Sequence, residues 1–146
     1  MGLKVKDVMA EDVVTIVPNE LIANAAHLMR SENVGCLVVL ESDDTIAGIL
    51  TDRDIAINCT GDAHDAKTCH VSAHMTSPVH TVTPETEVLD AARVLKNRRI
   101  RRLAVVQNNK MAGLLSYADI AAAMRRPLAD LLELEGMDAA RPQRDD

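Results

Sequence analysis

Aromatic side chains are almost absent from this sequence of 146 residues, which has one tyrosine and neither phenylalanine nor tryptophan. Proteins that bind single-stranded nucleic acid use aromatic rings as stacking platforms, so the composition disfavours that class of protein. Hydrophobic residues still make up 47% of the chain, which is enough for one domain, or for two small units that share an aliphatic core.

Long apolar runs, paired cysteines and net positive charge are also lacking. No stretch has the length of a signal peptide or a membrane span. Three unevenly spaced cysteines, Cys36, Cys59 and Cys69, do not form a disulfide framework. The formal net charge of −6 repels polyanions. We therefore expect a protein of the reducing cytoplasm that binds neither nucleic acid nor membranes.

Catalytic motifs are missing as well. The sequence contains no Gly-x-Ser-x-Gly elbow, no Walker loop and no His-Glu-x-x-His pair. We therefore expect that the protein is not an enzyme and needs no cofactor for catalysis.

Two halves of the chain repeat one another. Met9 aligns with Met75, 66 residues later, and Asp54 aligns with Asp119, 65 residues later. A match in order, spacing and residue type indicates an internal duplication. The predicted segments are a first repeat at 1–59, a linker at 60–69, a second repeat at 70–126, and a C-terminal helix and flexible tail at 127–146.

Each repeat has the pattern β-α-β-β-α. The first repeat predicts strands at 13–17, 36–40 and 46–50 and helices at 20–31 and 52–58; the second predicts strands at 79–82, 103–106 and 111–115 and helices at 85–97 and from 117. Pro127 should break or restart the last helix, and residues 136–146 should form a frayed tail. Because one such repeat has too small a core alone, we expect an α/β (α+β) fold in which two repeats pack through their sheets with pseudo-two-fold symmetry.

A short motif recurs where the third strand of each repeat meets the following helix. It reads Gly, two apolar residues, Thr or Ser, two further residues and Asp, and its last positions are Thr51 with Asp54 and Ser116 with Asp119. A hydroxyl at a helix start lies among free N–H groups that attract phosphate, and a carboxylate one turn later can accept hydrogen bonds from a diol. The same spacing also fits a capping box that satisfies only the helix itself.

With these motifs, the chain resembles a tandem pair of CBS domains over residues 5–124. The resemblance implies a module that binds adenosine compounds such as AMP, ADP, ATP or S-adenosylmethionine, and that often dimerises. It implies ribose contacts from Asp54 and Asp119 and phosphate-side hydroxyls from Thr51 and Ser116. Adenine would lie near Thr15 and Thr81.

The family often has a basic residue just before the second strand of a repeat. That position is Arg101 in the second repeat and Gly35 in the first, so we expect unequal sites, with the second favoured for a phosphorylated nucleotide. Arg53 or Arg102 could compensate in the first. The basic run at 98–102 also fits a solvated helix end or, less well, a nucleic-acid contact.

The linker gathers residue types that bind zinc. These weak candidates for a metal site are Cys59, His64, Cys69, His70 and His74. No Cys-x-x-Cys pair is present, so an exposed linker with incidental His and Cys is the alternative.

The sequence thus favours a regulatory homodimer that senses an adenosine-containing ligand between its repeats and signals to an effector protein that is unknown. The alternative is a CBS-fold dimer without nucleotide that serves as a protein-interaction module, with or without a metal in the linker.

Overall fold

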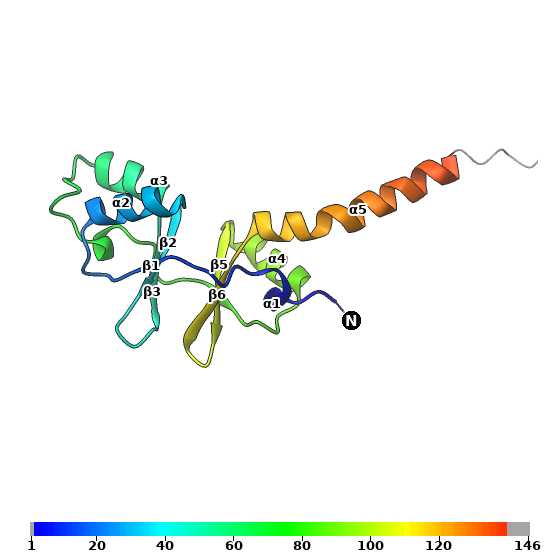
Figure 1. Ribbon diagram of the computed structural model, residues 1–146, viewed down its shortest axis with the longest axis horizontal. Helices are drawn as coiled ribbons and strands as arrows, with labels where there is room; N and C mark the ends of the chain where they lie inside the picture. Colours follow the sequence, from blue (N-terminus) through cyan, green and yellow to red (C-terminus); the bar gives the residue numbers. More distant parts are fainter. Residues whose placement is uncertain (1, 140–146) are drawn as a thin grey trace, which may run out of the picture.

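The computed structural model describes residues 2–139, which form two similar units and one long helix (Figure 1). The elements in chain order are α1 (Val5–Val8), β1 (Thr15–Ile16), α2 (Ile22–Glu32), β2 (Cys36–Leu40), β3 (Ile46–Thr51), α3 (Asp52–Asp54), the π-helix η1 (Ile55–Thr60), the 3₁₀ helix η2 (Val71–Ala73), β4 (Thr81–Val82), α4 (Val88–Arg98), β5 (Arg102–Gln107), β6 (Lys110–Ser116) and α5 (Tyr117–Ala139).

Two three-stranded mixed sheets confirm the predicted β-α-β-β-α repeats. The strand orders are β1-β2-β3 and β4-β5-β6. In each sheet the first pair is parallel and the hairpin is antiparallel, with Leu37 opposite Leu50 and Leu103 opposite Leu115. The sequence alignment of the halves therefore corresponds to a structural repeat.

Each sheet buries its two faces differently. Leu37, Val39 and Leu50 pack under the helices of the first repeat in one hydrophobic cluster. Val38, between two of them on β2, is also fully buried, and so is Ala104 on β5. Side chains alternate between the two faces of a strand, so Val38 and Ala104 each lie on the face of their sheet that points away from the helices of their repeat. On these faces the sheets of the two repeats approach one another (Figure 1).

Two segments, residues 3–10 before β1 and residues 69–76 before β4, each pack on the other repeat, and we call them the exchanged segments. Val5 of α1 is buried in the cluster of the second repeat, whereas Val71 of η2 is buried in that of the first. The exchange also caps the long helices, since Val88 N–H donates to Leu3 O and Ile22 N–H donates to Cys69 O, each at 2.9 Å. Neither helix has a side-chain cap of its own.

These backbone caps explain why α2 and α4 begin two or three residues later than predicted. The residues before them are extended and pair with the exchanged segments, as in the isolated bridges between Leu21 and His70 and between Lys4 and Glu87. The predicted helix at 52–58 is a single α-turn, α3, that widens into η1, where Gly61 N–H donates to Ala56 O.

The C-terminal helix differs from its prediction. It runs from Tyr117 through Pro127 to Ala139 without the expected break. The proline removes one donor, but this part of α5 is exposed, so water can satisfy the freed carbonyl. Residues 136–139 are therefore helical rather than frayed, and the rest of the predicted tail lies outside the described residues. Among the described residues, no helix has the length and apolar character needed to cross a membrane.

Candidate functional site

Both copies of the repeated motif form a capping box. Thr51 N–H donates to Asp54 Oδ2 at 2.9 Å, and Asp54 N–H donates to Thr51 Oγ1 at 3.1 Å. Ser116 and Asp119 make the same two bonds at 2.9 and 3.1 Å. One carboxylate oxygen of each aspartate is thus occupied by the backbone. The other oxygen of Asp54, Oδ1, accepts a long hydrogen bond of 3.5 Å from Asn58 Nδ2, a donor that a diol could replace.

A cleft opens where the first motif meets the segment before β4. Its volume is about 590 Å³. The first repeat contributes side chains from the end of β3 and from α3, and the second repeat contributes the segment before β4 and the turn before β5. Its lining residues are Ile49, Thr51, Asp52, Arg53, Thr76, Pro78, Val79, His80, Arg99, Ile100, Arg101 and Arg102.

The cleft is positively charged although the whole chain is negative. Four arginines, Arg53, Arg99, Arg101 and Arg102, line it against one acid, Asp52. Guanidinium groups present forked donors that match phosphate, and converging charges of one sign raise the local concentration of an anion. The arrangement therefore suits a phosphate-bearing ligand.

Arg101 lies in the same cleft as the first motif. Its backbone carbonyl accepts from Tyr117 N–H at 3.0 Å, just as Gly35 O accepts from Asp52 N–H at 2.9 Å, so the two positions are equivalent. Arg101 lines the cleft that contains Thr51. The expectation that the second site, with Ser116, is favoured for a phosphorylated nucleotide stays a prediction.

The lining of this cleft includes neither Asp54 nor the remaining predicted ligand residues. Thr81 follows His80 as the first residue of β4, and Thr15 begins β1; both are exposed. Ser116 and Asp119 cap α5. The roles of these residues toward a ligand stay predictions.

The motif glycine has a structural reason that we did not anticipate. A Cβ on Gly48 would lie 2.6 Å from Met75 Sδ and 2.9 Å from Thr76 O, and one on Gly113 would lie 2.7 Å from Ala10 O. At both positions an exchanged segment crosses the hairpin in direct contact with the backbone. The repetition of Gly with Met9 and Met75 was the available signal in the sequence.

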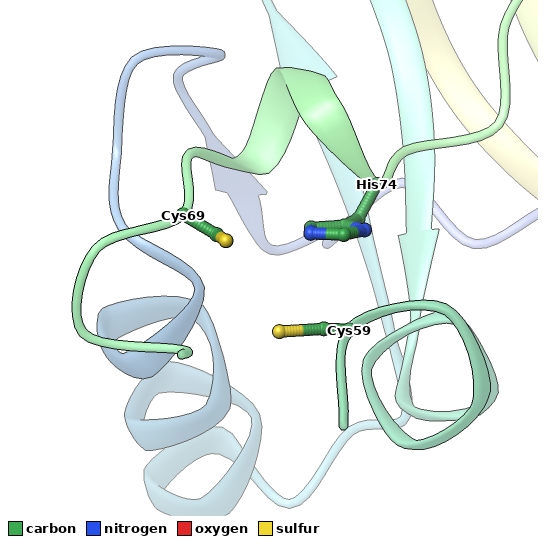
Figure 2. Close-up of side chains that lie close together, drawn as sticks. All are labelled: Cys59, Cys69 and His74. Atoms are coloured by element: carbon green, nitrogen blue, oxygen red, sulfur yellow. The ribbon is translucent and has the colours of Figure 1, made fainter. Parts of the chain in front are cut away.

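Three of the five candidate metal ligands come together beside η2. The side-chain ligand atoms of Cys59, Cys69 and His74 all lie within 4.8 Å of one another (Figure 2). His64 Nδ1 lies 3.4 Å from His74 Nε2. His70 is exposed, pairs through its backbone with Leu21, and is not in this group.

The thiols lie in protected surroundings. Burial is the main reason why the pKa of Cys59 is raised, and the neighbouring Cys69 raises it further. Burial likewise raises the pKa of Cys36, against the opposing influence of Arg102. Cys36, Cys59 and Cys69 are all free thiols in the structure.

Comparisons with known proteins agree with this architecture. The CBS domain-containing protein YhcV of Bacillus subtilis is 38% identical over 117 residues, which cover 80% of this chain and 82% of YhcV. The crystal structure of Hypoxic Response Protein I with two coordinated zinc ions has a TM-score of 0.74 at 27% identity and covers 82% of this chain and 98% of that chain.

A further solved structure shares the fold. The CBS domain pair of protein MJ0100, in complex with 5′-methylthioadenosine and S-adenosyl-L-methionine, has a TM-score of 0.76 at 23% identity and covers 87% of this chain and 99% of that chain. The CBS domain family model matches residues 5–59 and 71–126. Since these two matches span most of the chain, the protein belongs to the CBS domain family as a tandem CBS pair.

Proposed function

We propose that this CBS pair is a regulatory, non-catalytic module that binds an adenosine compound carrying phosphate in the cleft between its repeats. The observation that carries the proposal is the position of Thr51 in one cleft with Arg53, Arg101 and Arg102. A volume of about 590 Å³ lies within the range of small-molecule and cofactor sites.

The arginines favour the phosphorylated members of the family's ligands. AMP, ADP and ATP offer oxygens that guanidinium groups bind in pairs, whereas S-adenosylmethionine carries a cationic sulfur that four arginines would repel. We assign the phosphates to the arginines and the ribose diol to Asp54, which directly follows the cleft residue Arg53 in the chain. Adenine would lie against Val79, which is half-buried in the wall of the cleft.

A ligand held in this way would couple the two repeats. Thr51 and Arg53 belong to the first repeat, and Arg101 and Arg102 belong to the second. A phosphate bound between them stabilises the arrangement in which the groups converge. The ligand then shifts the conformation by its difference in affinity between two states, which is the basis of the proposed regulation.

We assign the output to a homodimer, and through it to an effector protein. α5 extends away from both repeats (Figure 1). Its exposed length carries large apolar side chains. Those more than half exposed are Leu128, Leu131, Leu132, Leu134 and Met137. Side chains three residues apart on a helix are neighbours, so Leu128, Leu131, Leu134 and Met137 form a continuous apolar stripe. Such a stripe is typical of a protein interface, and a second copy would offer the same stripe. We place this dimer in the cytoplasm.

The proposal is tested by thermal unfolding with adenosine, AMP, ADP, ATP, S-adenosylmethionine and GTP. At a hundred times its dissociation constant, a ligand that binds only the native state stabilises it by about 2.7 kcal/mol. We expect stabilisation to rise from adenosine to the phosphorylated compounds. Equal effects of adenosine and ATP would contradict the assignment of phosphate to the arginines.

The two motif aspartates provide a matched pair of variants. Asp54→Ala and Asp119→Ala both remove a capping box, so each lowers stability by about 1 kcal/mol. Only Asp54→Ala is expected to abolish the shift produced by the nucleotide. A loss confined to Asp119→Ala would move the site to the second motif, and the absence of any shift in the wild-type protein would refute the nucleotide proposal.

A further inference from the structure

We propose that Cys59, Cys69 and His74, together with His64, form a structural zinc site that fastens the linker to the first repeat. The site is separate from the nucleotide cleft, and the proposal does not depend on the proposed function. Two thiolates and two imidazoles are a common ligand set for structural zinc.

The positions of the side chains fit one ion. Both cysteine sulfurs and one imidazole nitrogen of His74 face the same space, although they come from η1, the linker and the residue after η2 (Figure 2). Tetrahedral zinc holds its sulfur and nitrogen ligands about 3.3–3.8 Å apart. Since the three ligand atoms already lie within 4.8 Å of one another, they reach zinc distances through shifts of about 1 Å or less.

His64 completes the set. Its Nδ1 lies 3.4 Å from His74 Nε2, close to the separation of two nitrogens bound to one zinc ion. The His64 ring is tilted by 55° to that of His74, so the two are not stacked. His64 N–H also donates to Cys59 O at 2.9 Å, which fixes the backbone of the fourth ligand beside the first.

Burial separates three of these four residues from incidental surface residues, whereas His64 is exposed. Cys59 is fully buried and His74 is 8% exposed, which makes it the one polar or charged residue in the core of the described chain. Cys69 is half-buried. The imidazole of His74 lies 3.4 Å from that of His64, and one metal ion could bind a nitrogen of each ring.

The second repeat provides an internal comparison. At the positions equivalent to Cys69 and His74 it has Leu3 and Val8, and the hydrogen bonds from Ile22 N–H to Cys69 O and from Val88 N–H to Leu3 O verify the register. Cys59 aligns with Met124.

Val8 and Met124 pack against the hydrophobic cluster of the second repeat. The same corner is therefore apolar in one repeat and composed of metal ligands in the other. Core packing alone does not require this difference, because aliphatic side chains fill the equivalent corner.

Zinc at this site would connect the linker with the cleft. The ion would join the end of η1 to Cys69 and His74, and binding releases the protons of the two thiols. Two residues after His74, Thr76 pairs with Ile49, and Thr76 itself lines the cleft. The ion would thus hold in place the segment that forms one wall of the nucleotide cleft.

Cobalt and zinc titrations of the full, reduced chain test the site. After removal of metal by a chelator, Co²⁺ should give the intense visible bands of a four-coordinate ion and a near-ultraviolet band from thiolate ligands, at one ion per chain. Zn²⁺ should displace it. A spectrum of six-coordinate cobalt without a thiolate band in the wild-type protein would overturn the proposal without recourse to any variant.

Matched variants assign the ligands. Cys69→Ser and His64→Gln should each weaken zinc binding by at least about tenfold, measured by competition with a chromophoric chelator. Cys36→Ser and His70→Gln, which lie outside the cluster, should leave binding unchanged. Zinc affinity that survives in Cys69→Ser, or that falls equally in Cys36→Ser, would overturn the assignment. Because the cobalt spectrum reports ligands and not nucleotide, failure here is distinguishable from failure of the proposed function.

Discussion

Ile49 and Thr76 exchange two backbone hydrogen bonds, at 3.1 Å from Ile49 N–H and at 2.8 Å from Thr76 N–H. Ala10 and Leu114 make the corresponding pair of bonds, both at 2.9 Å. These two bridges join the segment before each repeat to the hairpin, at the point where the motif glycine lets the backbones approach. The crossings bring residues of both repeats to one cleft.

A side chain at Gly48 should destabilise the protein. Gly48→Ala places a methyl group against Met75 Sδ and the carbonyl of Thr76, and relief of this overlap requires a shift of the crossing segment. We expect a loss of about 1–3 kcal/mol in the free energy of unfolding, measured by urea denaturation. Gly136→Ala is the control, because nothing lies within 4 Å of the added methyl group and alanine favours the helix. Equal stability of the two variants would contradict the close packing of Met75 and Thr76 against Gly48.

The arginines at 98–102 should bind the nucleotide through particular side chains and not through their total charge. Arg101→Ala removes a guanidinium from the cleft, and Arg98→Ala removes the same charge from a residue of α4 that does not line it. We expect Arg101→Ala to weaken ATP binding by about tenfold and Arg98→Ala to leave it nearly unchanged, as measured by calorimetry. Similar losses in both variants would indicate a diffuse attraction that any anion could use.

The contact of the N-terminal segment with the second repeat should depend on pH. The Glu85 carboxylate lies 2.9 Å from Lys6 Nζ and 3.0 Å from Lys4 Nζ, and hydrogen bonds from both, Lys6 first, lower its pKa from 4.5. A carboxylate with a lowered pKa stabilises the folded state above its unfolded pKa, and this contribution is lost as the pH falls through the folded pKa.

Glu85→Gln should therefore melt below the wild-type protein at neutral pH, and the two melting temperatures should converge as the pH falls through the folded pKa of Glu85. The difference is expected to be small and to shrink with added salt, since all three side chains are exposed. Thermal unfolding across the pH range measures it. A gap that is constant with pH would show that the charge of Glu85 is not the cause.

The stripe on α5 should carry the dimer. Leu131→Glu introduces a charge twice into a symmetric interface and removes burial of about 2 kcal/mol per copy, so the dissociation constant should rise by about a thousandfold. Sedimentation measures the change. Arg126→Gln alters one exposed charge about 160° around the helix from Leu128 and about 140° from Leu131, and should leave the dimer intact. A dimer that resists Leu131→Glu would place the interface elsewhere.

Local elements followed well from the sequence where the pattern was continuous. The apolar run at Cys36–Leu40 forms β2 with the predicted bounds, and the offset between Met9 and Met75 revealed the repeat. Helix starts were less accurate because α2 and α4 take their first hydrogen bonds from distant residues. Pro127 was a misleading signal, since an exposed helix can tolerate the missing donor.

The candidate sites combine residues that are distant in the sequence, and the spacing of residues within a motif does not predict such contacts. Thr51 was identified from the motif, but its position in one cleft with Arg101 follows from the packing of the two repeats against one another. The same holds for Cys59 and His74, fifteen residues apart and separated by a polar linker. Their approach follows from the return of that linker onto α2.

The exchanged segments give synthesis and packing opposite orders. Val5 is synthesised before either sheet, yet the cluster that buries it belongs to the second repeat. The first repeat can close once Val71 has been synthesised, whereas Val5 must wait for β5 and β6. While the first repeat folds on the ribosome, the apolar side chain of Val5 therefore stays uncovered.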